Sequence, residues 1–198
     1  MTYCIKPGYM IRAENDFDNE IGRTDECQNE VYAKAKVLVD EHGFDSVLDI
    51  GTGSGFKLMK FFRDKLTLGI DLEPTIEWVK QEHPERNWAT ISLECEHPPI
   101  GYDLVIAADV IEHLLDPDQL LNFIARCKPK LAIISTPNRD NLQGMFADGP
   151  PKNLCHVREW TAPEFREYLS QWFEILEHWI PEPNQTNYST MYIVGRLK

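Results

Sequence analysis

Three side chains that bind cations or transfer protons stand close together in the second half of the sequence. Asp109, Glu112 and His113 are spaced i, i+3 and i+4, so on a helical turn they would project from one face and converge. Two carboxylates and an imidazole can hold a divalent cation such as Mg²⁺, Mn²⁺ or Zn²⁺, which lowers the pKa of a bound hydroxyl. His156, in a later loop, can supply a fourth ligand. The alternative is that the carboxylates form caps or salt bridges and that His113 packs in the core.

A second group of residues has the composition of a cofactor cradle. In Val47-Leu-Asp-Ile-Gly-Thr-Gly-Ser-Gly-Phe56, a short apolar strand runs into Gly51, Gly53 and Gly55 before a helical pattern resumes at Lys57. Glycines between a strand and a helix leave backbone N–H groups facing a ligand, with no side chain to block its approach. The alternative is a glycine turn in some other α/β domain.

The spacing of the glycines bears on which cofactor binds. The dinucleotide fingerprint G-x-G-x-x-G needs a glycine where Phe56 stands, which disfavours a nucleotide-dependent oxidoreductase. Asp71 ends the next apolar stretch, about 20 residues after Gly51, the separation at which an acid reaches a ribose diol in doubly wound sheets. This acid fits any nucleoside cofactor. Its alternative role is a helix N-cap, at Asp71 or Glu73.

Apolar runs and helical periodicities alternate along the rest of the chain. We expect strands at 47–50, 66–71, 88–92, 102–108 and 129–137, a closing hairpin at 173–180 and 188–197, and helices at 28–42, 57–62, 75–83, 118–127 and 160–169. This alternation predicts a doubly wound α/β sheet with right-handed crossovers and helices on both faces. In the last helix, Thr161 and Glu164 have the spacing of a capping box.

Two polar segments flank this pattern. Residues 1–26 form an irregular N-terminal segment and possible lid, and residues 27–198 a single domain. Residues 138–159 form a long loop expected to cover the ligand crevice as a substrate lid. Tyr9, Arg12, Gln28 and Tyr32 could touch a ligand, although surface or packing roles fit each of them better.

The composition favours a small or neutral substrate. The chain has 198 residues, a net charge of −12 and a pI near 4.9, which disfavours binding to nucleic acid or to anionic membranes. Five scattered cysteines without a C-x-x-C pair predict reduced thiols in a cytoplasmic protein. The N-terminus lacks the apolar region of a signal peptide, and no apolar run approaches the length of a membrane span.

Four segments in the same order resemble the class I S-adenosylmethionine-dependent methyltransferases of the ubiquinone-biosynthesis and small-molecule type: Val47 to Gly55, Gly69-Ile-Asp71, Tyr102-Asp-Leu-Val-Ile and Asp109-Val-Ile-Glu-His-Leu-Leu-Asp-Pro117. The resemblance implies a seven-stranded Rossmann-like sheet of order 3-2-1-4-5-7-6 whose last strand is antiparallel. It also implies a set of cofactor contacts. Asp49, Gly51, Thr52, Gly53 and Gly55 would surround the methionine part, Asp71 and Leu72 the ribose, Ser92 or Glu94 the adenine, and Ala108 and Asp109 the sulfonium.

Two metal-assisted branches of these enzymes carry motifs similar to the segment that contains Asp109, Glu112 and His113. Ubiquinone-pathway O-methyltransferases and small-RNA terminal 2′-O-methyltransferases carry an E-x-x-E-H motif that binds a divalent ion, and Asp109-Val-Ile-Glu-His113 resembles it with Asp for the first Glu. The RNA enzymes add a motif similar to His156-Val-Arg-Glu-Trp-Thr161, after one similar to Thr136-Pro-Asn138. These last segments also resemble methyltransferases of bacterial polysaccharide and glycosyltransferase clusters.

The resemblance implies methyl transfer from S-adenosylmethionine to an oxygen, or secondarily a nitrogen, of a small molecule such as a sugar or a quinone-type acceptor. His113 would remove the hydroxyl proton, or a metal-bound base would do so beside Glu112. The alternatives are a metal-dependent RNA ribose 2′-O-methyltransferase and a catalytically silent, cofactor-binding subunit that regulates a partner.

Overall fold

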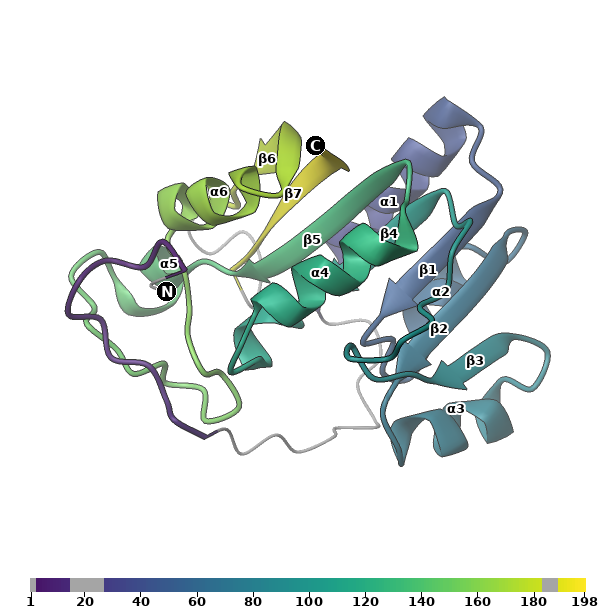
Figure 1. Ribbon diagram of the computed structural model, residues 1–198, viewed down its shortest axis with the longest axis horizontal. Helices are drawn as coiled ribbons and strands as arrows, with labels where there is room; N and C mark the ends of the chain where they lie inside the picture. Colours follow the sequence, from purple (N-terminus) through teal and green to yellow (C-terminus); the bar gives the residue numbers. More distant parts are fainter. Residues whose placement is uncertain (1–2, 15–26, 183–188) are drawn as a thin grey trace.

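A seven-stranded sheet forms the centre of the computed structural model, which describes residues 3–14, 27–182 and 189–198 (Figure 1). Its strands follow the chain as β1 Ser46–Ile50, β2 Leu66–Asp71, β3 Asn87–Thr90, β4 Leu104–Ala108, β5 Leu131–Pro137, β6 Phe173–Trp179 and β7 Thr190–Leu197. Their order across the sheet is β3-β2-β1-β4-β5-β7-β6. Strands β1 to β5 pair in parallel, and β7 is antiparallel to both β5 and β6. The expected fold is confirmed.

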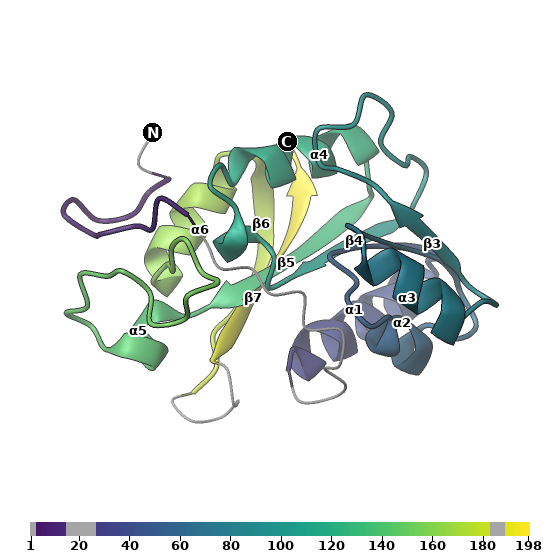
Figure 2. The same ribbon diagram turned by 90° about the horizontal axis from the view of Figure 1, so that it is seen from below.

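Helices cover both faces of this sheet (Figure 2). On one face lie α1 Asn29–His42, α2 Phe56–Phe61 and α3 Thr75–Glu82, and on the other lie α4 Asp118–Cys127 and α6 Ala162–Ser170. Neighbouring strand residues divide between the two faces, because Val47 packs with the first set of helices and Leu48 with the second. Strands β1 and β4 are buried along their whole length, as parallel strands covered on both sides are.

Most predicted elements lie within a few residues of the observed bounds. The helix expected at 118–127 is α4, the strand expected at 66–71 is β2, and the closing hairpin is β6 and β7. The predicted capping box is present, since the Thr161 hydroxyl accepts from the Glu164 amide while the Glu164 carboxylate accepts from the Thr161 amide. No disulfide joins any of the five cysteines, all of which lie within the described residues.

The segment 138–159, expected to be a loop, contains a short helix. Helix α5 spans Arg139–Gln143. Asn138 is its N-cap, and the Asn138 side chain accepts from the Asp140 amide. The Arg139 side chain is buried and donates to the Glu159 carbonyl and the Glu164 carboxylate. The prediction of an irregular loop is therefore wrong for this stretch, because contacts from distant residues stabilise the turn.

The described part of the N-terminal segment lies along residues 148–157 (Figure 1). The Met10 amide donates to the Asp148 carbonyl, the Arg12 amide to the Val157 carbonyl, and the Trp160 indole to the Tyr3 carbonyl. The rest of the possible lid, residues 15–26, falls outside the described residues. Within the described ranges, no helix is long and apolar enough to cross a lipid bilayer.

Candidate functional site

A cavity of about 850 Å³ opens at the carboxyl ends of β1, β2 and β4, where Ile50, Asp71 and Ala108 line it. Ligands of open α/β sheets bind at this edge, where the strand order changes direction. All the predicted cofactor residues except Asp49 and Gly55 line the cavity, namely Gly51, Thr52, Gly53, Asp71, Leu72, Ser92, Glu94, Ala108 and Asp109. Gln28 and Tyr32 of the N-terminal helix region line it as well, whereas Tyr9 and Arg12 do not.

The glycine bend after β1 has the conformation that its sequence predicts. Gly51, Gly53 and Gly55 all have positive φ angles, of 72°, 54° and 70°, which residues with a side chain adopt at a cost. A Cβ atom on Gly51 would lie 2.5 Å from a methyl carbon of Val110. A Cβ atom on Gly53 would meet no protein atom within 4 Å, so at this position the backbone faces open space in the cavity.

Asp49 supports this bend from behind. Its carboxylate accepts hydrogen bonds from the hydroxyls of Tyr32 and Thr52, both at 2.9 Å. Burial raises the pKa of Asp49 to about 7, although these two hydrogen bonds oppose the shift. Because Thr52 belongs to the bend and Tyr32 to α1, Asp49 ties the N-terminal helix to the backbone that lines the cavity.

Asp71 connects the second strand to the same bend. One of its carboxylate oxygens accepts from the Gly53 amide at 2.9 Å, and the other accepts from the Leu72 amide at 2.8 Å. Burial raises the pKa of Asp71, and these two backbone hydrogen bonds oppose the rise. The carboxylate lies at the cavity wall, where a ribose hydroxyl can donate to it.

Asp109 does not converge with Glu112 and His113 as the helical spacing predicted. Its φ angle is 54°, and the following 3₁₀ turn, η1, begins only at Ile111 and ends at His113, so the three side chains do not share a helical face. The Asp109 carboxylate instead accepts from the Ser135 hydroxyl at 2.6 Å and the Thr190 hydroxyl at 2.9 Å. Asp109 therefore links the ends of β4, β5 and β7.

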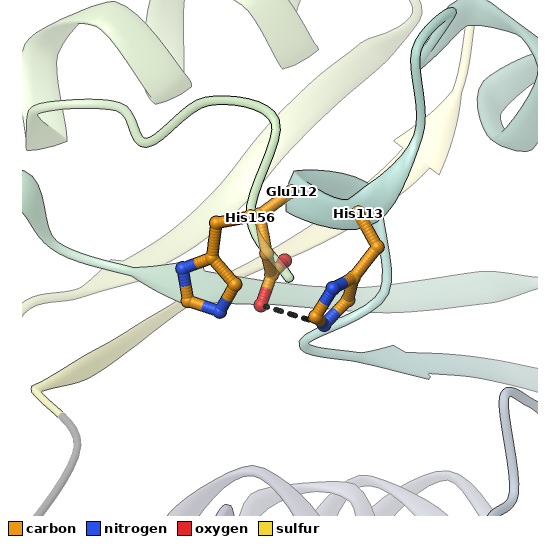
Figure 3. A group of neighbouring side chains, drawn as sticks. All are labelled: Glu112, His113 and His156. Carbon is orange, nitrogen blue, oxygen red and sulfur yellow. Dashed lines mark ion pairs between the residues drawn. The ribbon is translucent and has the colours of Figure 1, made fainter. Parts of the chain in front are cut away.

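The possible metal ligands that do come together are Glu112, His113 and His156 (Figure 3). One ligand atom from each lies within 4.8 Å of the others. The Glu112 side chain is fully buried. Its Oε2 accepts from the Thr136 hydroxyl at 3.1 Å, whereas Oε1 has no hydrogen-bond partner within the described residues. A buried carboxylate oxygen without a donor is costly, and a cation would satisfy it.

The two imidazoles direct lone pairs toward the same space. His113 Nδ1 lies 2.8 Å from the Cys155 carbonyl, which can only accept, so Nδ1 carries the proton. His113 Nε2 then holds a lone pair, and it lies 3.9 Å from Glu112 Oε1. The two imidazole rings are 5.0 Å apart between centroids. Two nitrogens and one carboxylate oxygen form a ligand set for a borderline cation such as Zn²⁺, whereas Mg²⁺ and Mn²⁺ are harder cations that favour oxygen ligands, and Mg²⁺ demands them most strictly.

Burial also sets the charge of Glu112. It raises the pKa of Glu112 well above the ordinary value, and the negative charge of Asp109 adds to the rise. A cation in contact with Oε1 would favour the ionised carboxylate and reverse this effect. The residues present therefore fit a divalent cation.

Some residues that complete the site carry no signal in the sequence. The Cys155 carbonyl contacts His113, and Ser135 and Thr190 hold Asp109. These contacts join segments that are distant in the chain, so neither periodicity nor motif spacing could reveal them. Asn153 and Glu159 also contact His156, and each lies only three residues from it.

Residues 25–178 match a family model described as a methyltransferase domain. Among curated proteins, no sequence matches the chain.

Three solved structures illustrate the fold likeness. The methyltransferase domain of bacterial CtHen1 has a TM-score of 0.66 at 21% identity, covering 84% of this chain and 96% of that one. The Burkholderia thailandensis 1,6-didemethyltoxoflavin-N1-methyltransferase, solved with 1,6-didemethyltoxoflavin and S-adenosylhomocysteine, has a TM-score of 0.67 at 20% identity, covering 88% and 80%. A SAM-dependent methyltransferase from Aquifex aeolicus has a TM-score of 0.65 at 17% identity, covering 92% and 100%. At these identities the likeness is one of fold.

Proposed function

This chain belongs to the methyltransferase-domain family, and from that premise we propose that it transfers a methyl group from S-adenosylmethionine to a hydroxyl oxygen of a small molecule. The cavity supports this assignment of cofactor. The bend from Gly51 to Gly53 would receive the methionine part, and Asp71 the ribose hydroxyls. Ser92 and Glu94 also line the cavity and would contact the adenine, and Ala108 and Asp109 would contact the sulfonium.

The observation that carries the choice of oxygen is the group formed by Glu112, His113 and His156 within the same cavity. These residues would hold a divalent cation, since they place one unsatisfied carboxylate oxygen beside imidazole nitrogens. A divalent cation, when bound, supplies a Lewis acid that lowers the pKa of a nearby hydroxyl. A thioether is already a good leaving group, so this site needs chiefly to align the acceptor and help its proton to leave.

The protein residues contribute alignment and proton transfer. Glu112, His113 and Ala108 all line the same cavity, so an acceptor hydroxyl beside the first two would share that cavity with the sulfonium. Without a cation, the His113 Nε2 lone pair can accept the hydroxyl proton. Residues 138–159 contribute Leu142, Gln143 and Asn153 to the wall, and this segment would cover the acceptor and exclude water.

The acceptor that we propose is a small hydroxylated molecule, such as a sugar or a quinone-type compound. The net charge of −12 opposes the binding of a polyanion. Five cysteines without a disulfide among the described residues fit a reducing, cytoplasmic environment.

A terminal ribose 2′-hydroxyl of RNA is the second candidate. The specific observation that favours it is the position of His156, because this lid histidine joins Glu112 and His113 as the resemblance to the RNA 2′-O-methyltransferases implied. An acceptor panel should therefore contain RNA oligonucleotides with a free terminal diol beside sugars and phenols.

The test is a methyl-transfer assay with isotopically labelled S-adenosylmethionine on the purified protein. We expect turnover that is lost with a chelator, restored by Mn²⁺ or Zn²⁺, and reduced at least about 100-fold by Glu112→Gln. Cofactor affinity, measured by calorimetry, should be unchanged by the chelator and by this variant. Turnover that the chelator does not change would contradict the metal part of the proposal, and His113 would then be the base. Cofactor binding without turnover of any acceptor would favour a silent regulatory subunit.

A further inference from the structure

We propose that Glu159 is the positioning residue that prepares His156 to bind the cation, by holding its imidazole in one tautomer and one orientation. This inference rests on the proposed metal-assisted function and deepens it. Glu159 lies in the motif from His156 to Thr161, but no role was assigned to it there, and the role proposed here follows from its contacts within residues 138–159.

Glu159 is held as firmly as a core residue. Its side chain is 1% exposed, and its Oε1 lies 2.7 Å from His156 Nδ1. The other oxygen, Oε2, accepts from the Gln143 side chain at 2.5 Å. Arg139 donates to the Glu159 carbonyl at 2.9 Å, which holds the backbone beside the carboxylate. Glu159 can therefore fix the direction of the imidazole.

The hydrogen-bond network assigns the tautomer of His156 by two independent routes. A carboxylate accepts, so the contact with Glu159 places the imidazole proton on Nδ1. On the other side of the ring, Asn153 Oδ1 accepts from the Cys155 amide at 2.9 Å, which orients the amide group. Its Nδ2 then donates to His156 Nε2 at 2.9 Å. The contact with Asn153 requires a lone pair on Nε2, and together with the proton on Nδ1 this gives the neutral tautomer that binds a metal through Nε2.

The same segment places this lone pair beside Glu112. The Val157 amide donates to the Glu112 carbonyl at 2.8 Å, so the residue after His156 is bonded to the backbone of the carboxylate ligand. Arg158 adds two hydrogen bonds, to the Leu114 and Leu115 carbonyls at 2.7 and 2.6 Å. The backbone contacts bring His156 to the site, and Glu159 turns its ring. Metal binding would exchange the Asn153 hydrogen bond for coordination.

A carboxylate behind a metal-binding histidine raises the basicity of the ligand and prevents the ring from turning, and loss of such a partner typically costs 10–100-fold in metal affinity. Gln143 completes the arrangement, since it occupies the oxygen of Glu159 that does not face His156. The carboxylate is then left with one imidazole to orient.

The first measurement needs no metal. We would record the ¹⁵N chemical shifts of the His156 ring in the intact protein, in Glu159→Gln and in Glu159→Ala. We expect the wild type to show a protonated Nδ1, Glu159→Gln to keep this form because its amide oxygen still accepts, and Glu159→Ala to change toward the Nε2-protonated form. A His156 ring with the same tautomer in the wild type and in Glu159→Ala would overturn the proposal.

The second measurement is Mn²⁺ affinity, followed by electron paramagnetic resonance. We expect Glu159→Ala to weaken binding about 10–100-fold and Glu159→Gln to fall between it and the wild type. Glu164→Gln is the matched control, because Glu164 is another largely buried carboxylate that contacts Arg139 and the Lys6 amide. This variant should lower thermal stability and keep the Mn²⁺ affinity. Affinity for S-adenosylhomocysteine should be equal in all four proteins, which confirms that each is folded.

The outcomes separate this inference from the function on which it rests. If the wild type binds no Mn²⁺ or Zn²⁺, the proposed metal-assisted function fails, and the proposal about cation binding fails with it. If the wild type binds Mn²⁺ and Glu159→Ala binds it equally well, the positioning role of Glu159 is wrong while the metal site stands. If Glu164→Gln weakens binding as much as Glu159→Ala, the effect is a general loosening of the lid, which also contradicts the proposal.

Discussion

The Asp49 carboxylate combines a structural task with an electrostatic cost. It accepts hydrogen bonds from the Tyr32 and Thr52 hydroxyls behind the glycine bend. Burial nevertheless raises its pKa from 3.8 to about 7. The folded protein therefore holds this proton more tightly than the unfolded chain does. The contribution of Asp49 to stability is largest below its unfolded pKa and decreases as the pH rises through its folded pKa.

Asp49→Asn should remove this pH dependence. Between about pH 4 and pH 7 the wild type should lose stability relative to the variant, by at most about 1.4 kcal/mol per pH unit. The measurement is urea denaturation of both proteins at pH 5 and pH 8. We expect the difference between their unfolding free energies to shift in favour of the variant at pH 8. An equal difference at both pH values would show that Asp49 is ionised throughout.

Asp71 should control cofactor affinity more than stability. Asp71→Asn keeps an oxygen that can accept from the Gly53 amide but loses the charge, so affinity for S-adenosylhomocysteine should fall roughly tenfold or more, and Asp71→Ala should bind more weakly still. Glu73→Gln is the control, because Glu73 is exposed and its carboxylate contacts the Glu77 amide and Thr90. Isothermal titration calorimetry on the three variants gives the comparison. Unchanged binding by Asp71→Ala would remove the ribose assignment.

Single residues show where sequence reasoning succeeds and where it stops. The motif predicted that His156 would join Glu112 and His113, and the structure brings the three together. It also predicted that Asp109 would share a helical face with them, but Asp109 has a left-handed backbone outside the 3₁₀ turn, and its carboxylate accepts from the Thr190 hydroxyl. Thr190 lies 81 residues further along the chain, so no local pattern could anticipate this contact.

At the scale of elements, two glycines of the bend should affect different properties: Gly55 the stability of the protein, and Gly53 its affinity for the cofactor. Gly55→Ala would place a Cβ atom 2.6 Å from the Trp88 ring at a φ angle of 70°, and should lose about 2–4 kcal/mol of stability from strain and overpacking. Gly53→Ala meets no protein atom and should lose only about 1–2 kcal/mol. Its methyl group would enter the cavity, so cofactor affinity should fall by more than tenfold. Thermal unfolding and calorimetry measure the two effects. Gly53→Ala with full affinity would show that the cofactor does not approach the bend.

Arg158 attaches residues 138–159 to the segment that follows Glu112 and His113. Its buried guanidinium reaches the Leu114 and Leu115 carbonyls and lies 4.9 Å from the Tyr3 ring centre. Lysine cannot bridge two carbonyls in this way, so Arg158→Lys should lose about 2 kcal/mol of stability and also bind Mn²⁺ more weakly.

Arg126→Lys provides the control for this prediction. Arg126 likewise bridges two carbonyls, those of Leu93 and Cys95, and Leu93 lines the cavity. This variant should lose stability without a change in Mn²⁺ affinity. Chemical denaturation and a Mn²⁺ titration distinguish the two arginines. Equal effects on Mn²⁺ affinity would mean that Arg158 has no special link to the site.

The bounds of elements with strong periodicity could be predicted from the sequence, whereas the short helix within residues 138–159 could not. Helix α4 and strand β2 have the predicted bounds because their apolar patterns match their surroundings. Helix α5 has five residues and depends on the contacts of Arg139 with Glu159 and Glu164. A helix this short forms because tertiary contacts stabilise it, and helix propensity alone does not predict it.

At the scale of the whole molecule, the position of the site follows from the topology. The chain builds the sheet outward from β1 in one direction through β2 and β3, and in the other through β4 and β5. The loops after β1 and β4 therefore separate and leave the cavity between them. The alternation of strands and helices predicted the doubly wound sheet. The strand order and the antiparallel β7 came from the resemblance to a family, because periodicity does not specify the order of strands.

The most direct test of the central claim is a crystal structure of this protein with S-adenosylhomocysteine. The claim is that the bend from Gly51 to Gly53 and the Asp71 carboxylate form the binding site of an adenosyl cofactor. We predict ribose hydroxyls within hydrogen-bond distance of Asp71 and the sulfur atom near the backbone of Ala108. A nucleoside bound anywhere else on the protein, or no binding at saturating concentration, would contradict the account.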